Sequence, residues 1–320
     1  MEQIIQLINE QYSFVLVGHT GPDGDTIGSC YGLAFALEQL GKNVSVVLEP
    51  YSQKYNIIPG HKFLHTGLLD ELDVNVLIAL DSADVGRLGS GLSLFARAKH
   101  TVCIDHHKTN IGFANINHIE PETSSTSEII FRLIEKLVEP TVEIAAAIYA
   151  GMVCDTGGFK YNSTTKSTMD IAARLMGIGI PFTEIYNEVL HSHTFAAGRA
   201  KGIVMQNAKQ TLDGRITFSH ISHKDLVSVG ADISDLDGVV EYLLSTRGTD
   251  VAAFVYEKQN SVIKISFRSQ GPDVSAVAAE MGGGGHTLAA ASSLTGDIET
   301  VTVRALQLLE KEIVEYDRHS

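Results

Sequence analysis

The chain has 320 residues, of which 44% are hydrophobic, and this length exceeds the size at which one hydrophobic core is usual. With 38 acidic and 24 basic residues it carries a net charge of −14, so the molecule as a whole does not attract a long polyanion. We therefore expect two domains. The net negative charge excludes long nucleic acids as partners, so any nucleic-acid substrate should be short.

The thiols and the first residues indicate the cellular compartment. Cys30, Cys103 and Cys154 lie in apolar surroundings without paired-ligand spacing, which is typical of reduced, buried thiols. Residues 1–6 lack the regions of a signal peptide, and no apolar run approaches the ~20 residues that a membrane span needs. We expect a cytoplasmic protein with no membrane partner. The sequence leaves the oligomeric state open, and a homodimer is one of the states that it allows.

The first part of the chain alternates between strand-like and helix-like segments. Strands are predicted at residues 14–17, 44–48, 74–80 and 101–104, and helices at residues 2–11, 25–40, 127–138, 144–148 and 167–176. The strands are mostly apolar throughout, as expected when helices cover both faces of a parallel sheet. This pattern predicts a doubly wound α/β domain over residues 1–190.

The alternation pauses near residues 191–194, and a second β-rich unit follows. Its predicted strands are 215–221, 251–257 and 261–268, and its predicted helices are 235–244, 274–281 and 298–316. A helix over 195–207 is predicted to connect the two parts. We therefore expect a linker at 191–208 and a smaller α/β domain at 209–320.

Carboxylates and imidazoles follow several apolar segments of the first domain. These residues are His19, Asp23, Asp25, Asp81, Asp105, His106, His107 and Asp155. In a parallel α/β sheet, such residues collect beyond the carboxyl ends of the strands. Mixed imidazole and carboxylate ligands suit Mn²⁺, and a pair of ions serves phosphoester hydrolysis by activating water and stabilising charge. The pattern predicts a site for two Mn²⁺ ions.

Some of these residues also have simpler interpretations. An aspartate after a strand often caps a helix or a turn, and this interpretation is preferred for Asp84. Asp105 is suited to orienting a neighbouring histidine as well as to binding metal. His191 and His193 are interpreted as hinge or surface residues.

Four motifs resemble those of the DHH phosphoesterase superfamily in order and spacing: Gly18 to Ser29, Asp81 to Asp84, Asp105-His106-His107 and Asp155-Thr156-Gly157. The resemblance implies one metal held by His19, Asp23 and Asp81. It implies a second metal held by Asp25, Asp81, His106 and Asp155, with Asp81 as the bridge. It also implies that His107 faces the substrate phosphate and that Asp105 supports it.

The second domain contains a candidate phosphate site. The glycines of residues 282–285 offer backbone N–H groups without side chains, as in anion-binding loops, although a flexible loop is the simpler alternative. A strand ending near Arg268 adds a guanidinium suited to phosphate, and His286 is suited to stacking on a base. The predicted substrate contacts are Arg268, Gly283, Gly284, Gly285 and His286.

This second domain looks like the DHHA1 domain of NrnA-type nanoRNases, and the resemblance covers essentially the whole chain. It implies hydrolysis of very short oligoribonucleotides to mononucleotides, with 3′ to 5′ polarity favoured, and removal of the 3′-phosphate of 3′-phosphoadenosine 5′-phosphate. Met281 and residues 289–291 depart from the pattern expected there.

Other functions compete with this one. The nearest alternative is a phosphodiesterase for cyclic di-nucleotides or their linear products. A family II-like pyrophosphatase resembles the chain only in the first domain, and a RecJ-type exonuclease is longer. A non-catalytic nucleotide-binding regulator is disfavoured because no predicted ligand position is missing.

Overall fold

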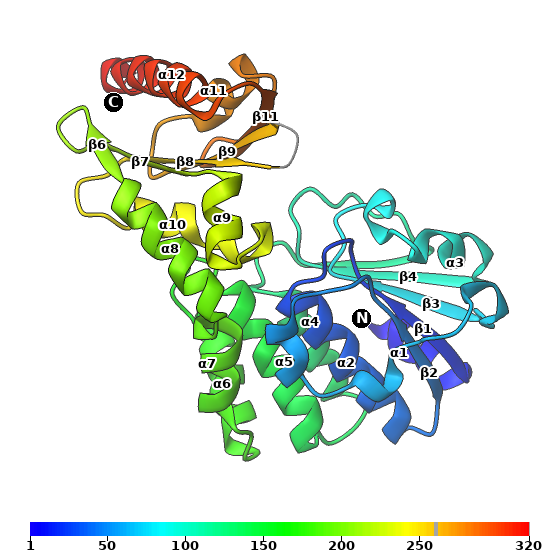
Figure 1. Ribbon diagram of the computed structural model, residues 1–320. Coiled ribbons are helices and arrows are strands. Elements are labelled where there is room, and N and C mark those ends of the chain that lie inside the picture. Colours follow the sequence, from blue (N-terminus) through cyan, green and yellow to red (C-terminus); the bar gives the residue numbers. More distant parts are fainter. Residues whose placement is uncertain (259–261, 320) are drawn as a thin grey trace. The chain divides into compact units, whose positions relative to one another are not determined.

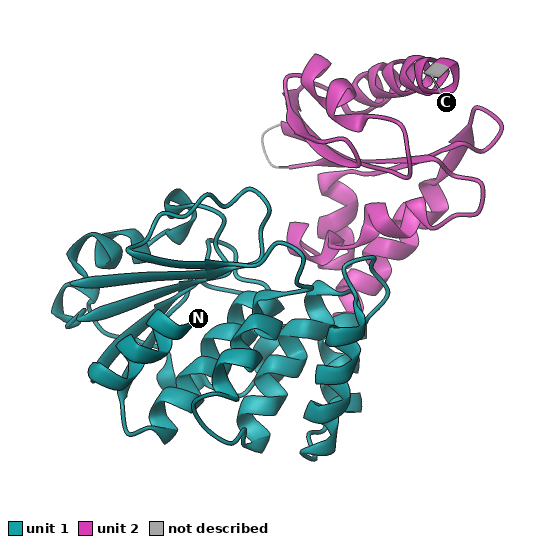
Figure 2. Ribbon diagram, turned by 180° about the vertical axis from the view of Figure 1, so that it is seen from behind, with its two compact units in different colours: residues 1–192 teal, residues 193–320 magenta. Residues whose placement is uncertain are grey.

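The computed structural model describes residues 1–258 and 262–319, and the chain divides into two compact units, 1–192 and 193–320 (Figure 2). Ser261, the predicted first residue of a strand, lies outside the described residues. Within the described ranges, no helix is long and apolar enough to cross a membrane. Each unit has its own buried core and sheet.

Unit 1 is built on a five-stranded, all-parallel sheet in the order β2-β1-β3-β4-β5 (Figure 1). The strands are β1 (Ser13–Val17), β2 (Asn43–Val47), β3 (Val76–Leu80), β4 (His100–Asp105) and β5 (Ile116–Ile119). The α-helices are α1 (Glu2–Glu10), α2 (Gly24–Gln39), α3 (Gly91–Arg97), α4 (Thr126–Ile134), α5 (Val142–Asp155), α6 (Lys166–Gly177) and α7 (Phe182–His191). Short 3-10 turns are η1 (Gln53–Ile57), η2 (His61–Phe63), η3 (Leu69–Glu71) and η4 (Val85–Leu88).

Both faces of this sheet are buried, which explains the continuous apolar strands. In β3, Ile78 and Leu80 belong to the core beneath α2, α4 and α5, whereas Leu77 and Ala79 belong to a second core with Leu94 of α3. Alternate side chains therefore enter different cores, as in a sheet with helices on both faces. The predicted doubly wound α/β fold is confirmed.

Helices α3, α5 and α7 of unit 1 differ from the prediction, and α3 was not predicted at all. The apolar stretch before Asp155 belongs to one long helix, α5, in which residues 144–153 are all buried. Because burial on every side leaves no amphipathic pattern, the sequence predicted only a short helix at its start. Helix α7 was not predicted, although its Ile185 and Val189 are spaced for one buried face.

Unit 2 has a six-stranded mixed sheet in the order β10-β11-β9-β8-β7-β6, in which only the β7–β8 pair is parallel. The strands are β6 (Lys209–Thr211), β7 (Ile216–Ile221), β8 (Val251–Glu257), β9 (Val262–Ser269), β10 (Gly284–His286) and β11 (Ala289–Thr295). The helices are α8 (Phe195–Asn207), α9 (His223–Val229), η5 (Ile233–Leu236), α10 (Val239–Leu244), α11 (Val274–Glu280) and α12 (Ile298–His319). Helices α11 and α12 cover one face of the sheet, and α8, α9 and α10 cover the other (Figure 1).

The start of unit 2 is more ordered than a linker. Of the stretch 191–208, residues 195–207 form α8, whose Ala200 and Val204 are fully buried in the core of unit 2. Only residues 192–194 between α7 and α8 are not helical. The helix predicted over 235–244 is interrupted at Gly238, which has φ +74° and begins a new segment, α10.

Candidate metal centre

The polar residues of unit 1 converge because the ends of neighbouring parallel strands lie side by side. Strand β1 pairs with β3 and β3 pairs with β4, so Val17 lies opposite Ala79 and Leu80 opposite Ile104. The residues that follow these strands therefore leave the sheet at one edge. Asp23 and Asp25 are added at the amino end of α2, and Asp155 is the last residue of α5.

All six residues predicted as metal ligands are brought together at this edge. Three groups have potential ligand atoms within 4.8 Å of one another: His19 with Asp23 and Asp81, Asp25 with His106 and Asp155, and Asp81 with His106 and His107. Asp81 and His106 each belong to two groups, so the groups form one continuous cluster. Oxygen-rich ligation with some imidazole nitrogen fits a divalent ion such as Mn²⁺.

His19 is oriented for ligation through Nε2. Its Nδ1 lies 2.9 Å from the carbonyl oxygen of Thr20, whereas Nε2 lies 3.8 Å from Asp23 and 3.6 Å from Asp81. Burial by itself lowers the pKa of His19, but the carboxylates of Asp23 and Asp81 outweigh it and raise the pKa to about 10. The carboxylates of Asp23 and Asp81 thus stabilise a positive charge next to Nε2 of His19, as a bound cation would supply.

Asp23 serves two purposes with its two oxygens. Its Oδ1 caps α2 by accepting from the N–H groups of Asp25 and Thr26, at 3.0 and 3.1 Å. Its Oδ2 faces His19, and about half of the side chain is exposed. The simple capping interpretation and the ligand interpretation therefore both apply.

The pKa values of Asp25 and Asp155 show that the carboxylates of the cluster repel one another. Burial, followed by repulsion from Asp81, Asp155 and Asp23, raises the pKa of Asp25 well above its usual value. Burial and the repulsion of nearby carboxylates also raise the pKa of Asp155 to about 6. Four carboxylates in one cluster, of which Asp25 and Asp81 are buried, favour a compensating cation, so the residues present fit a divalent metal.

Asp81 stands at the centre of the cluster in an unusual backbone conformation. Its φ is +57°, which few residues other than glycine, asparagine and aspartate adopt. Its Oδ2 accepts from the hydroxyl of Thr26 at 2.7 Å, and its Oδ1 accepts from the hydroxyl of Thr126 at 3.1 Å. Nε2 of His106 lies 3.6 Å from Oδ1. Asp81 is thus a buried carboxylate held on both oxygens.

Asp105 is fully buried and acts on its neighbours. Its carboxylate accepts from Nδ1 of His107 and from the amide of Asn110, both at 2.7 Å. Burial opposes the charge, but these hydrogen bonds hold the pKa of Asp105 below its usual value, and the bond to Asp105 is the main cause that raises the pKa of His107. A third of the His107 side chain is exposed, so this histidine meets solvent.

Several polar residues of the centre were not predicted. They are Thr26, Arg87, Asn110, Thr126 and Ser127. Thr126 and Ser127 begin α4, and their N–H groups donate to Asp25 at 2.7 and 2.8 Å. The only sequence signal was the hydroxyl-rich run 123–127 before an apolar helix, which is also typical of a simple helix cap.

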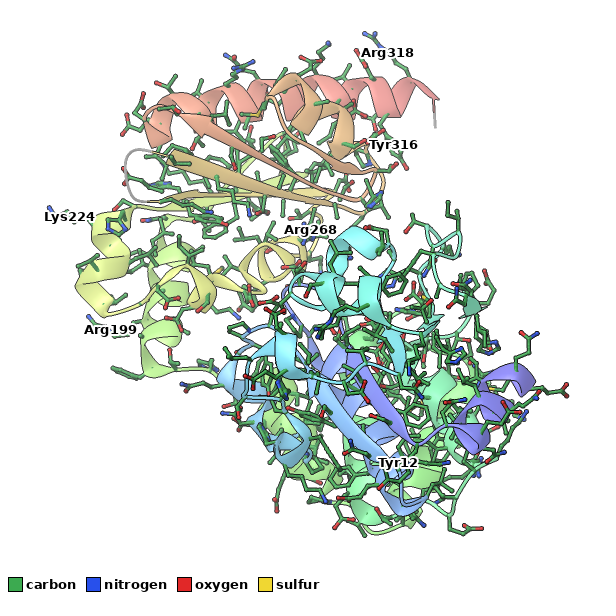
Figure 3. All side chains as sticks on the ribbon, turned by 90° about the vertical axis from the view of Figure 1, so that its right-hand side faces the viewer. Tyr12, Arg199, Lys224, Arg268, Tyr316 and Arg318 are labelled. Atoms are coloured by element: carbon green, nitrogen blue, oxygen red, sulfur yellow. The ribbon has the colours of Figure 1, made fainter. Side chains whose placement is uncertain are left out.

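The candidate phosphate site of unit 2 differs in part from the expectation. Gly282 and Gly283 donate their N–H groups to carbonyls of α11, and residues 284–286 form β10, which pairs with β11. The run is therefore not an open loop of free N–H groups. Arg268 lies on β9 (Figure 3), and its Nε donates to Glu241 of α10 at 2.8 Å. His286 is exposed.

Two family models match the chain, one in each of its two units. Residues 13–152 match the family model for the DHH family, N-terminal domain, and residues 221–315 match the DHHA1 domain. The bifunctional oligoribonuclease and PAP phosphatase NrnA of Thermus thermophilus is 32% identical over 92% of this chain and 88% of its own length. The NrnA of Bacillus subtilis is 27% identical over 91% of this chain and 92% of its own length.

A solved structure has the same fold over nearly the whole chain. The crystal structure of an exopolyphosphatase-related protein from Bacteroides fragilis superposes with a TM-score of 0.87 at 29% identity. The match covers 98% of this chain and 95% of that one.

Proposed function

The chain belongs to the DHH phosphoesterase family, with a DHH and a DHHA1 domain, and we propose that it is a metal-dependent oligoribonuclease and nucleotide phosphatase. Its substrates are very short oligoribonucleotides, hydrolysed to mononucleotides, and 3′-phosphoadenosine 5′-phosphate, which loses its 3′-phosphate. The observation that carries the proposal is the convergence of the six predicted histidine and aspartate ligands, Asp81 among them, in one cluster.

Two Mn²⁺ ions complete the proposed centre. One would be held by His19, Asp23 and Asp81, and the other by Asp25, Asp81, His106 and Asp155. The grouping of ligand atoms supports the first set and, in the second, joins Asp25, His106 and Asp155, while Asp81 shares a group with His106. When bound, the ions supply a more acidic water and positive charge beside the phosphoryl oxygens. The carboxylates fix the positions of the ions, and the imidazole of His19 is held in the tautomer that leaves Nε2 free.

His107 is the proposed contact to the substrate phosphate. Asp105 holds its Nδ1, so Nε2 remains available to donate to a phosphate oxygen. Asp105 is a positioning residue, because its burial keeps it from the substrate. The raised pKa of His107 favours the charged imidazole, which binds a phosphate more strongly than the neutral ring.

Unit 2 is proposed to recognise the rest of the substrate. Its candidate contacts are Arg268 of β9, a half-buried guanidinium whose Nε donates to Glu241, and His286 of the edge strand β10, which offers an exposed aromatic ring. Gly283, Gly284 and Gly285 contribute by letting the backbone approach the ligand closely. A substrate bound in this way is short, in agreement with the acidic surface of the chain.

A length series tests the proposal. Oligoribonucleotides of two to ten residues, 3′-phosphoadenosine 5′-phosphate and a cyclic di-nucleotide are incubated with the protein and Mn²⁺, and products are separated by chromatography. We expect the fastest release of mononucleotides from the shortest chains and inorganic phosphate from the nucleotide. If the cyclic di-nucleotide alone is hydrolysed, the alternative activity replaces this one; if nothing is hydrolysed, the enzyme proposal is wrong.

A cytoplasmic location is part of the proposal and is supported by the thiols. All three cysteines are free, and Cys30 and Cys103 are buried. Burial raises the pKa of Cys103 to about 12, so this thiol stays protonated and unreactive at neutral pH. A chain without disulfides suits a reducing compartment.

A further inference from the structure

A buried turn that leads into the first residues of α4 connects three parts of unit 1. Its residues Ser124, Ser125, Thr126 and Ser127 are all fully buried, which is uncommon for consecutive hydroxyl side chains. Ser125 caps α4 by accepting from the N–H of Glu128, so the cap does not require the other hydroxyls. The hydroxyls of Ser124 and Thr126 and the N–H groups of Thr126 and Ser127 are directed to carboxylates, and the hydroxyl of Ser127 donates to the backbone carbonyl of Asp25.

Thr126 contacts two of the proposed metal ligands through different atoms. Its backbone N–H donates to Oδ2 of Asp25 at 2.7 Å, and its hydroxyl donates to Oδ1 of Asp81 at 3.1 Å. The N–H of Ser127 donates to the other oxygen of Asp25 at 2.8 Å. One turn therefore fixes the orientation of both carboxylates.

The turn itself is anchored by the buried side chain of Glu128. This carboxylate accepts from Ser124 at 2.7 Å and from two hydroxyls of α6, Ser167 at 2.7 Å and Thr168 at 2.9 Å. Glu128 is 2% exposed, so water does not compete for these bonds. The position of the turn is thus set by a helix that contributes no ligand.

From these contacts we infer that Thr126 is a positioning residue for the metal centre, acting through its hydroxyl on Asp81. The inference rests on the proposed function, because Asp81 is the ligand proposed to touch both ions. A carboxylate that bridges two ions must present both oxygens at fixed angles. Each oxygen of Asp81 accepts one hydroxyl, Oδ2 from Thr26 and Oδ1 from Thr126, and these two hydrogen bonds fix the orientation of the carboxylate.

The geometry allows one hydrogen bond to be removed by itself. Thr126→Val keeps the β-branched shape and the backbone N–H to Asp25, and it deletes only the hydroxyl donated to Asp81. Thr126→Ser keeps that hydroxyl. Loss of such a supporting hydrogen bond weakens metal binding by about 10- to 100-fold.

A matched control is present at the opposite end of β4. Thr101 is also buried, and its hydroxyl accepts from the N–H of Asn115 at 2.9 Å. Thr101→Val therefore removes a buried hydroxyl from the same unit without touching the metal centre. It is expected to lower the thermal midpoint and to leave Mn²⁺ affinity unchanged.

The experiment measures Mn²⁺ binding to the full chain by isothermal titration, with circular dichroism after chelation as a check of folding. We expect about 10- to 100-fold weaker binding for Thr126→Val, near wild-type binding for Thr126→Ser, and wild-type binding for Thr101→Val. Activity of Thr126→Val should recover as Mn²⁺ is raised, since the ligands themselves remain. Thr26→Val removes the hydroxyl that donates to Oδ2 of Asp81. Its Mn²⁺ affinity tests the same inference if Thr126→Val does not fold.

The outcomes separate the inference from the function on which it rests. If folded Thr126→Val binds Mn²⁺ as tightly as the wild type while the wild type hydrolyses dinucleotides, the inference alone is wrong. Equal loss of affinity in Thr101→Val would assign the effect to general destabilisation and also overturn it. A wild-type chain that binds no Mn²⁺ overturns the proposed function as well.

Discussion

The close contact between α2 and α5 makes Gly28→Ala a sensitive test of the metal centre. A Cβ at Gly28 would lie 2.4 Å from the carbonyl oxygen of Ala147 and 3.0 Å from the backbone nitrogen of Gly151. Both are backbone atoms, and since real Cβ contacts are essentially never under 3.0 Å, the helices must separate by about 0.6 Å. These helices carry Asp25 and Asp155, whose ligand atoms belong to one group.

The magnitude follows from two opposing effects. Overpacking costs about 1–3 kcal/mol, whereas replacing a helical glycine by alanine gains about 1 kcal/mol. We expect a net loss of up to about 2 kcal/mol, or up to about 8 °C in thermal midpoint. Because metal–ligand distances tolerate only about 0.2 Å, a 0.6 Å displacement should also weaken Mn²⁺ binding and reduce activity by roughly 10- to 100-fold.

Two further glycines give graded controls for this variant. A Cβ at Gly32 would clash with the side chain of Ile148, at 2.6 and 2.9 Å, whereas the nearest backbone atom, the carbonyl oxygen of Ile144, is at an ordinary 3.9 Å. Because the side chain of Ile148 is able to change rotamer, Gly32→Ala should lose less stability and keep Mn²⁺ binding. A Cβ at Gly177, the last residue of α6, meets nothing within 4 Å, so Gly177→Ala should be neutral or stabilising. A Gly28→Ala protein with wild-type thermal midpoint and Mn²⁺ affinity would refute the reasoning.

Other predictions concern single groups. Asp81→Asn, which tolerates the positive φ, should reduce kcat by at least about 100-fold on every substrate; retained activity on any of them would contradict its bridging position. Arg268→Ala should raise KM for dinucleotides by about 10-fold or more in steady-state assays, and an equal loss of kcat on all substrates would contradict a binding role. Mn²⁺ at 100 times its Kd should add about 2.7 kcal/mol to the free energy of unfolding over chelated protein; scanning calorimetry that detects no difference argues against binding. Thr165→Val removes the capping box of α6 and should cost about 1 kcal/mol in denaturant unfolding; an unchanged free energy of unfolding would contradict the capping role.

The ligand-bearing edge of unit 1 was predictable because its strands are buried on both faces. A run such as Val76–Leu80 is continuous and apolar, and the first polar residue after it, Asp81, marks the end of the strand. Parallel order then places the ends together, whatever their separation along the chain. The same burial hid α5, since a helix that is apolar all round has no periodic signal.

Contacts between distant residues could not be predicted in the same way. The hydroxyl of Thr126 reaches a carboxylate 45 positions earlier, and Arg268 meets Glu241 27 positions away. Neither pair has a local pattern, because the fold alone brings them together. The glycine run 282–285 differs in part from an open loop for a related reason: Gly282 and Gly283 donate to carbonyls of α11, and residues 284–286 pair with β11, contacts that single-sequence patterns do not show.

The strand order of unit 1 has a consequence for its synthesis on the ribosome. From β1 outward, the strands β3, β4 and β5 are added to one edge in the order in which they emerge. The group of His19, Asp23 and Asp81 is therefore complete as soon as β3 has joined, whereas the group of Asp25, His106 and Asp155 waits for the end of α5. We expect stalled nascent chains to gain Mn²⁺-dependent protease resistance in two steps, one at each of these lengths.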